Sequence, residues 1–152
     1  MTSQWPHDDT ASKIKFFGKP GTNLVPLTPP FQMYYDHHPI KTITVNKMVA
    51  TSLLKVFTEI LDKCNHDQKM VDAIGASAYG GCYNNRSIRG STNISNHAFA
   101  AAIDIDPDNN PLGTKVGKMS PITIAAFKNE GWLWGGDYTG RKDWMHFEAV
   151  SR

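Results

Sequence analysis

Two short segments in the second half of the chain carry acidic and imidazole side chains at alternate positions. They are Ala102-Ile103-Asp104-Ile105-Asp106 and Asp143-Trp144-Met145-His146-Phe147-Glu148. Successive side chains of a β-strand point to opposite faces. The alternating apolar residues therefore predict the core face of each strand, with Ile103 and Ile105 in the first and Met145 and Phe147 in the second. His146 and Glu148 then share the polar face of the second strand.

A metal site is one interpretation of this pattern. If the two strands pair, Asp104 and His146 converge, and His97 can fold back from the loop before the first strand. Two imidazoles and one carboxylate hold catalytic zinc and leave an open position for water. The same spacing equally allows an ordinary aspartate–histidine hydrogen bond within a sheet.

Two other chemistries fit less well. Neither His97 nor His146 begins the His-x-Asp pair that is typical of non-haem iron oxygenases. Neither Cys64 nor Cys82 has a neighbour that would activate it as a thiol nucleophile.

Asp143 stands three residues before His146, so we expect it in the loop that precedes the strand. From there it can lean toward a metal without binding it. A carboxylate in that place can take a proton from a metal-bound water and pass it to a leaving amine. The alternative is an aspartate that caps a turn.

The two segments resemble a known family. Ser95-Asn96-His97-Ala98-Phe99-Ala100-Ala101-Ala102-Ile103-Asp104 is similar to the S-x-H-x-x-G-x-A-x-D motif of the zinc D-Ala-D-Ala peptidases, and Asp143 to His146 resembles their second motif, acid-x-x-His. That family contains D-alanyl-D-alanine carboxypeptidases and dipeptidases, and phage endolysins that are L-alanyl-D-glutamate endopeptidases. The segments 80–90 and 131–136 look like the endolysin branch. Ala100 replaces the glycine of the family motif.

The resemblance implies one zinc ion per chain, bound by His97, Asp104 and His146, with Asp143 as the general base. It also implies an arginine before the first motif that binds a substrate carboxylate or stabilises the oxyanion.

Arg86 fits that place best, and Arg89 is the reserve candidate. Ser95 would support the ligands or contact the substrate. The aromatic segment around Trp132, Trp134 and Trp144 either lines the cleft or fills the core.

The elements that must position these residues follow from pattern and capping signals. The clearest is a long helix that Asn46 caps, with an apolar face from Val49 to Cys64. The other expected elements are strands over 40–45, 77–83, 100–106 and 145–150, a short helix over 67–73, a loop over 84–96, and a helix from Ser120-Pro121 to Glu130. This order predicts an α+β fold in which a small antiparallel sheet carries the zinc site and packs against the long helix. The resemblance implies the same, a LAS/hedgehog-like peptidase fold.

The 152 residues predict a single peptidase domain with no separate cell-wall-binding domain. Residues 1–39 are rich in proline, glycine and aromatic residues and predict an extended wrapping segment, whereas residues 75–150 carry the motifs. A net charge of +2 without a dense basic stripe argues against a nucleic-acid partner. No apolar run approaches the ~18 residues of a membrane span, so we expect no membrane insertion.

The sequence thus predicts a monomeric zinc metallopeptidase that hydrolyses peptidoglycan stem peptides, as a phage-type endolysin that cuts the L-Ala-D-Glu bond. The alternatives are a D-alanyl-D-alanine carboxypeptidase and a non-catalytic zinc-containing binding domain. The first residues have neither a basic nor an apolar stretch, so we expect no signal peptide. The protein would be made in the host cytoplasm and reach the cell wall after membrane permeabilisation by a partner such as a holin.

Overall fold

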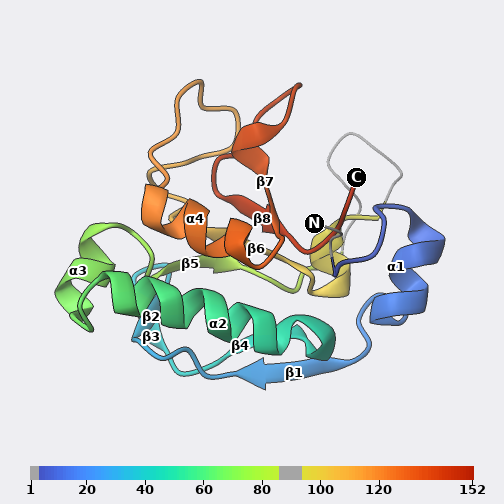
Figure 1. Cartoon of the computed structure of the whole chain (residues 1–152), viewed down its shortest axis with the longest axis horizontal. Coiled ribbons are helices and arrows are strands. Elements are labelled where there is room, and N and C mark those ends of the chain that lie inside the picture. Colours follow the sequence, from blue (N-terminus) through green and yellow to red (C-terminus); the bar gives the residue numbers. More distant parts are fainter. Residues whose placement is uncertain (1–3, 86–93) are drawn as a thin grey trace.

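The computed structural model describes residues 4–85 and 94–152 and has an α+β fold (Figure 1). Its helices are α1 (Thr10–Phe17), α2 (Lys47–Lys63), α3 (Gln68–Ala73) and α4 (Pro121–Asn129), with 3₁₀ turns η1 (Asn96–Phe99) and η2 (Gly135–Asp137). Its strands are β1 (Leu24–Leu27), β2 (Met33–Tyr35), β3 (His38–Ile40), β4 (Ile43–Asn46), β5 (Ala78–Gly81), β6 (Ala102–Ile105), β7 (Leu133–Trp134) and β8 (His146–Glu148). The predicted fold class is confirmed.

The main sheet has six strands in the order β3-β2-β5-β6-β8-β7, and β1 pairs with β4 in a separate two-stranded sheet. All neighbours in these sheets are antiparallel except β2 and β5. Parallel neighbours need a long crossover. Here the crossover from β2 to β5 contains α2 and α3. The antiparallel prediction is therefore correct for the part of the sheet that carries the candidate site.

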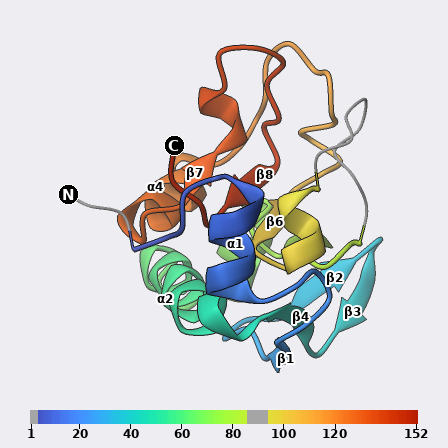
Figure 2. The ribbon, with the colours of Figure 1, turned by 90° about the vertical axis from the view of Figure 1, so that its right-hand side faces the viewer.

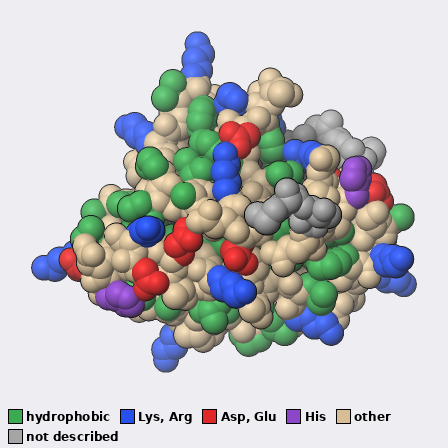
Figure 3. Space-filling model, in the orientation of Figure 1, with side chains coloured by type: hydrophobic (Ala, Val, Ile, Leu, Met, Phe, Trp, Pro, Cys, Tyr) green, Lys and Arg blue, Asp and Glu red, His purple; other side chains and the backbone are tan. Residues whose placement is uncertain are grey.

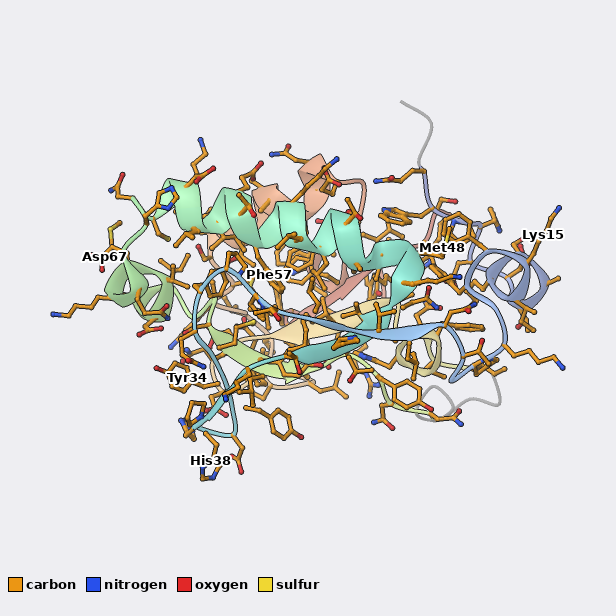
Figure 4. The ribbon with its side chains drawn as sticks, turned by 90° about the horizontal axis from the view of Figure 1, so that it is seen from below. Lys15, Tyr34, His38, Met48, Phe57 and Asp67 are labelled. Atoms are coloured by element: carbon orange, nitrogen blue, oxygen red, sulfur yellow. The ribbon has the colours of Figure 1, made fainter. Side chains whose placement is uncertain are left out.

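Helix α2 forms as its sequence predicts. The side chain of Asn46 caps it by accepting a hydrogen bond from the N–H of Met48 at 2.9 Å. Its buried residues lie three and four positions apart: Val49, Ser52, Leu53, Val56, Phe57 and Ile60. Figure 4 shows Phe57 between α2 and the strands, on the side away from Tyr34 and His38. Helix α2 thus covers the apolar side of the strands and leaves the opposite face of the sheet for polar side chains.

The sequence predicts an extended segment over residues 1–39, but the structure contains a helix there, α1. Helix α1 begins after Asp9, whose side chain caps it by accepting a hydrogen bond from the N–H of Ser12 at 2.7 Å. The helix buries Lys13 and Phe17. A buried lysine interrupts the apolar spacing on which helix prediction relies, which explains why the helix was missed.

The N-terminal segment lies against the end of the chain. The N–H of Asp8 donates to the carbonyl of Ser151 at 2.9 Å, and Trp5 packs edge-on against Trp132 with ring centroids 5.8 Å apart. Figure 2 shows α1 beside η1, and the ring of Phe17 packs against that of Phe99 with centroids 6.0 Å apart. The first residues of the chain therefore help to build the surroundings of the two motif segments.

No helix within residues 4–85 and 94–152 is both long enough and apolar enough to cross a bilayer. On the face shown in Figure 3, basic and acidic side chains are intermixed.

Candidate metal centre

Asp104 and His146 face each other across β6 and β8. The antiparallel register pairs Asp104 with His146 and Ile103 with Phe147. Ile103 and Phe147 are fully buried in the core, so their neighbours project from the other face. Nδ1 of His146 lies 3.2 Å from Oδ1 of Asp104. The convergence predicted from the alternating pattern is present.

Met145 departs from the prediction because it is only partly buried and lines the hollow in front of the site. Strand β8 begins at His146, one residue later than expected. A turn precedes it, in which the N–H of His146 donates to the carbonyl of Asp143 at 3.1 Å.

His97 reaches the same place from η1. The hydroxyl of Ser95 caps this turn by accepting a hydrogen bond from the N–H of His97 at 3.2 Å. The chain then reverses toward β6 at Ala100, which has left-handed backbone angles of φ 54° and ψ 36°. Nε2 of His97 lies 3.4 Å from Oδ2 of Asp104. The candidate ligand atoms of His97, Asp104 and His146 all lie within 4.8 Å of one another.

The hydrogen bonds of the two imidazoles determine which nitrogen each one offers. Nδ1 of His97 donates to the carbonyl of Cys82 at 2.8 Å, so Nε2 is the nitrogen that a metal could use. Nε2 of His146 donates to Oε1 of Glu148 at 2.7 Å, so Nδ1 is the nitrogen that a metal could use. Both of these nitrogens adjoin the Asp104 carboxylate. Histidines that bind metals are held in this way by a second hydrogen bond. Two nitrogens and one carboxylate oxygen suit zinc with an open fourth position, so these residues fit the metal that the resemblance implies.

The electrostatics of the cluster favour charge at the acidic groups. Burial raises the pKa of Asp104, but hydrogen bonds from His146 and His97 outweigh that effect and hold the pKa well below its usual range. Burial lowers the pKa of His146, but hydrogen bonds to Asp104 and Glu148 outweigh it and raise the pKa to about 10. Without a metal, His146 therefore carries a proton on both ring nitrogens, and a metal must displace the proton on Nδ1 in order to bind.

Asp143 lies in the loop before β8, as expected. Its backbone is fixed at both ends, because its N–H donates to the carbonyl of Gly135 at 3.0 Å and its carbonyl accepts from His146. A side chain on Gly135 would overlap the carbonyl of Asp143, so the glycine permits this close approach.

The Asp143 side chain borders the same hollow as the three candidate ligands, and its Oδ1 is buried without a hydrogen-bond partner among the described residues. Burial raises the pKa of this carboxyl. These features differ from those of a turn cap, whose oxygen would accept a backbone hydrogen bond.

The hollow in front of these groups has a volume of about 540 Å³. Besides the three candidate ligands and Asp143, polar and charged side chains border it: Asp8, Ser95, Asn96, Tyr138, Arg141, Glu148 and Arg152. A site of this kind can hold a metal ion beside an unpaired carboxylate and admit a polar peptide.

Comparison with known families agrees with this geometry. Residues 89–149 match the family model of D-alanyl-D-alanine carboxypeptidases. This stretch contains His97, Asp104, Asp143 and His146, so the resemblance to the zinc D-Ala-D-Ala peptidases is confirmed, and the match supports a peptidase. It does not single out the endolysin branch. No curated protein and no solved structure matches the chain.

The remaining predicted site residues have different outcomes. Arg86 and Arg89 lie outside the described residues. Ser95 borders the hollow, and its hydroxyl supports the turn that carries His97. Trp132 is a core residue whose Nε1 donates to the hydroxyl of Ser52 at 3.0 Å, so it does not line the cleft.

Trp134 and Trp144 also belong to a structural contact. Their rings pack edge-on with centroids 5.6 Å apart, and Nε1 of Trp134 donates to the carbonyl of Trp144 at 2.9 Å. Neither borders the hollow. The core alternative therefore holds for Trp132, whereas Trp134 and Trp144 are partly buried and neither line the hollow nor belong to the buried core.

Glu148 borders the hollow and contacts His146, and the sequence analysis gave it no role. Its place two residues after His146 put it on the same face, which was a usable signal. Tyr138 and Arg152 also contact Glu148, and Asp8 contacts Arg152. These residues come from separate segments and have no spacing that would reveal them.

Proposed function

We propose that this protein is a zinc peptidase that hydrolyses peptidoglycan stem peptides. The observation that carries the proposal is the convergence of His97, Asp104 and His146 beside Asp143, a carboxylate with an unpartnered buried oxygen. Three ligands with a separate carboxylate make up the minimum equipment of a metal hydrolase. When bound, zinc lowers the pKa of a coordinated water toward ~7 and polarises the scissile carbonyl.

The chain's own residues have distinct roles in this proposal. His97, Asp104 and His146 hold the ion, and Glu148 fixes the orientation of His146 through Nε2. Asp143 accepts a proton from the attacking water at a carboxylate oxygen and returns it to the nitrogen of the leaving amine. Its burial raises the pKa and so brings the acid nearer to the range in which it can both take and release a proton.

Arg86 is proposed to bind the substrate carboxylate or to stabilise the oxyanion, with Arg89 in reserve. Both assignments rest on the resemblance.

For the bond cleaved, we propose L-Ala-D-Glu hydrolysis of the phage-endolysin type. Its support is the likeness of segments 80–90 and 131–136 to that branch. D,D-carboxypeptidase activity is the second candidate, because the family model that matches residues 89–149 is described as D-alanyl-D-alanine carboxypeptidase. An endopeptidase needs a cleft open at both ends, whereas a carboxypeptidase needs one end closed around a terminal carboxylate.

The test is mass spectrometry of fragments released when purified peptidoglycan is incubated with the zinc-loaded protein. A new amino terminus on D-Glu supports the endopeptidase, and loss of terminal D-Ala supports the carboxypeptidase. A protein that retains zinc and binds the wall but releases no fragment would instead be the non-catalytic binding domain. The matched control is Asp143→Asn, which keeps the three ligands and removes the proton acceptor.

A further inference from the structure

A continuous set of ion pairs leads from the N-terminal segment to His146. Glu148 lies at its centre and is 3% exposed. Its Oε1 accepts hydrogen bonds from Nε2 of His146 and from the hydroxyl of Tyr138, both at 2.7 Å. Its Oε2 accepts a hydrogen bond from Nη2 of Arg152 at 2.7 Å. A buried carboxylate needs such compensation, and Arg152 supplies the permanent positive charge.

Arg152 is held in turn by Asp8. Oδ2 of Asp8 accepts from Nε of Arg152 at 3.1 Å and lies 3.0 Å from Nη2. Oδ1 of Asp8 accepts from Nζ of Lys13 at 3.0 Å. The same ammonium donates to the side-chain oxygen of Asn96 at 2.9 Å, and Asn96 directly precedes His97.

Asp8 thus joins β8, which carries His146, to η1, which carries His97. The side-by-side packing of α1 and η1 in Figure 2 fits this connection.

We propose that Arg152 is a positioning residue for the metal site and acts through Glu148 on His146, with Asp8 holding Arg152 in place. The inference rests on the zinc site of the proposed function. The guanidinium holds the Glu148 carboxylate in place through Oε2, so that Oε1 stays directed at Nε2 of His146 and accepts its hydrogen bond. Nδ1 of the imidazole is then the nitrogen that faces Asp104 and the metal. Without Arg152, Oε2 of the buried Glu148 loses its hydrogen-bond partner, and Glu148 holds the tautomer and orientation of His146 less firmly.

Simple charge repulsion predicts the opposite result. Removing a positive charge near a site for a divalent cation should strengthen binding of the cation. If removal of Arg152 weakens zinc binding, the cause is therefore the lost positioning of His146 and not the lost electrostatic repulsion between the arginine and the zinc ion. Arg141 is the matched control, because it borders the same hollow and its charge acts on Asp143, whereas no ion pair joins it to Glu148, Asp8 or a candidate ligand among the described residues.

The experiment measures zinc affinity by competition with a chelating dye, and the absorption spectrum of the cobalt-substituted protein, for the parent chain and four variants. Arg152→Gln should weaken zinc binding by ~10-fold or more and alter the cobalt spectrum. Arg152→Lys should restore part of the affinity, because it keeps the charge but not the forked geometry. Asp8→Asn should show a smaller loss, and Arg141→Gln should bind zinc as tightly as the parent or more tightly.

The proposal is overturned if Arg152→Gln binds zinc at least as tightly as the parent, or if Arg141→Gln weakens binding equally. If Arg152→Gln does not fold, Asp8→Asn decides, and an unchanged zinc affinity overturns the proposal. All measurements are made without substrate, so failure of the parent to cleave peptidoglycan contradicts the proposed function alone. A parent chain that binds no zinc contradicts both.

Discussion

Nδ1 of His146 lies 3.2 Å from Oδ1 of Asp104 because the two residues are direct partners across antiparallel strands. The pairing is fixed by the apolar residues beside them, since Ile103 and Phe147 must both face the core. A slip of one residue would move His146 into the core and Phe147 onto the polar face. The register of two short strands therefore determines whether the metal centre exists.

The first prediction concerns the three candidate ligands. His97→Ala, Asp104→Ala and His146→Ala should each reduce bound zinc from one per chain to a small fraction after dialysis, because only two protein ligands remain. Metal analysis of the purified variants measures this directly. His66→Ala is the control, because its histidine is exposed and pairs with Asp62 away from the site. Full zinc content in all three ligand variants would end the assignment.

The second prediction is the pH dependence of the metal-free protein. The pKa of His146 is raised from 6.5 to about 10, so the stability that its proton contributes is complete below pH 6.5 and is lost as the pH rises toward 10. The pKa of Glu148 is lowered from 4.5 to about 2, despite burial, chiefly by the hydrogen bond from His146. Its contribution is complete above pH 4.5 and is lost as the pH falls toward 2. Together, His146 and Glu148 favour maximal stability of the metal-free protein between pH 4.5 and pH 6.5.

Zinc reverses the alkaline part of this profile, because it binds the neutral imidazole and releases the proton. The increase in Tm on adding zinc should be larger at about pH 8 than at about pH 6. Thermal unfolding of metal-free and zinc-loaded protein at both pH values measures the difference. An increase in Tm that is equal at both, or larger at the lower pH, would contradict the exchange of proton for metal at His146.

The alternation of residue types was sufficient to predict that Asp104 and His146 converge, whereas the assignment of a zinc site came from the family resemblance. Ile103 and Phe147 identify the buried face of each strand. Asp104 and His146 must then both project from the opposite face of the sheet. The loop position of Asp143 followed from the same argument, since an unbroken strand would have turned it inward. Local patterns succeed here because a strand's period of two is set by its backbone.

The surroundings of the site could not be predicted in that way. Lys13 is buried because Asp8 and Asn96 compensate its charge, and Asn96 is 83 positions away. Arg152 meets Asp8 over 144 positions. Such contacts are created by the tertiary fold, and a single sequence has no local signal for them. Helix α1 and the parallel pairing of β2 with β5 were not predicted for the same reason, because both depend on contacts between distant parts of the chain.

The third prediction concerns Ala100, where the family motif has glycine. Its φ of 54° is costly for a residue with a Cβ, by about 1 kcal/mol. Ala100→Gly removes that cost but also a buried methyl group and some rigidity of the unfolded chain, so the free energy of unfolding should change by less than about 1 kcal/mol. Ala100→Val should destabilise by more than ~2 kcal/mol, because a β-branched side chain meets both the strained backbone and a full core. Chemical denaturation of the two variants measures the contrast, and an Ala100→Val protein as stable as the parent would contradict the prediction.

The last prediction separates a catalytic base from a ligand and from a structural residue. Asp143→Asn keeps the size of the side chain and removes only its ability to accept a proton. The variant should fold and bind zinc like the parent, while its turnover on peptidoglycan falls by ~10²–10⁴, the usual contribution of general base catalysis. The parent's activity should rise with pH through the pKa of Asp143, which burial raises above the usual aspartate range, because the base must be ionised to act. The residual activity of the variant should lack that acidic limb.

Three measurements on Asp143→Asn then distinguish the possible roles: zinc content, thermal stability, and the pH profile of cleavage. If Asp143 is a fourth metal ligand, the Asp143→Asn variant should lose zinc together with activity. If Asp143 only caps a turn, the Asp143→Asn variant should cleave peptidoglycan at nearly the parent's rate, because the amide oxygen can accept the same hydrogen bond. Asp143→Glu adds a further test, since its longer carboxylate should recover part of the activity if a base is all that the position requires. The role of Asp143 as a general base requires that the Asp143→Asn protein folds, binds zinc fully and is nearly inactive. Its buried Oδ1, which has no hydrogen-bond partner among the described residues, would then accept the proton of the attacking water.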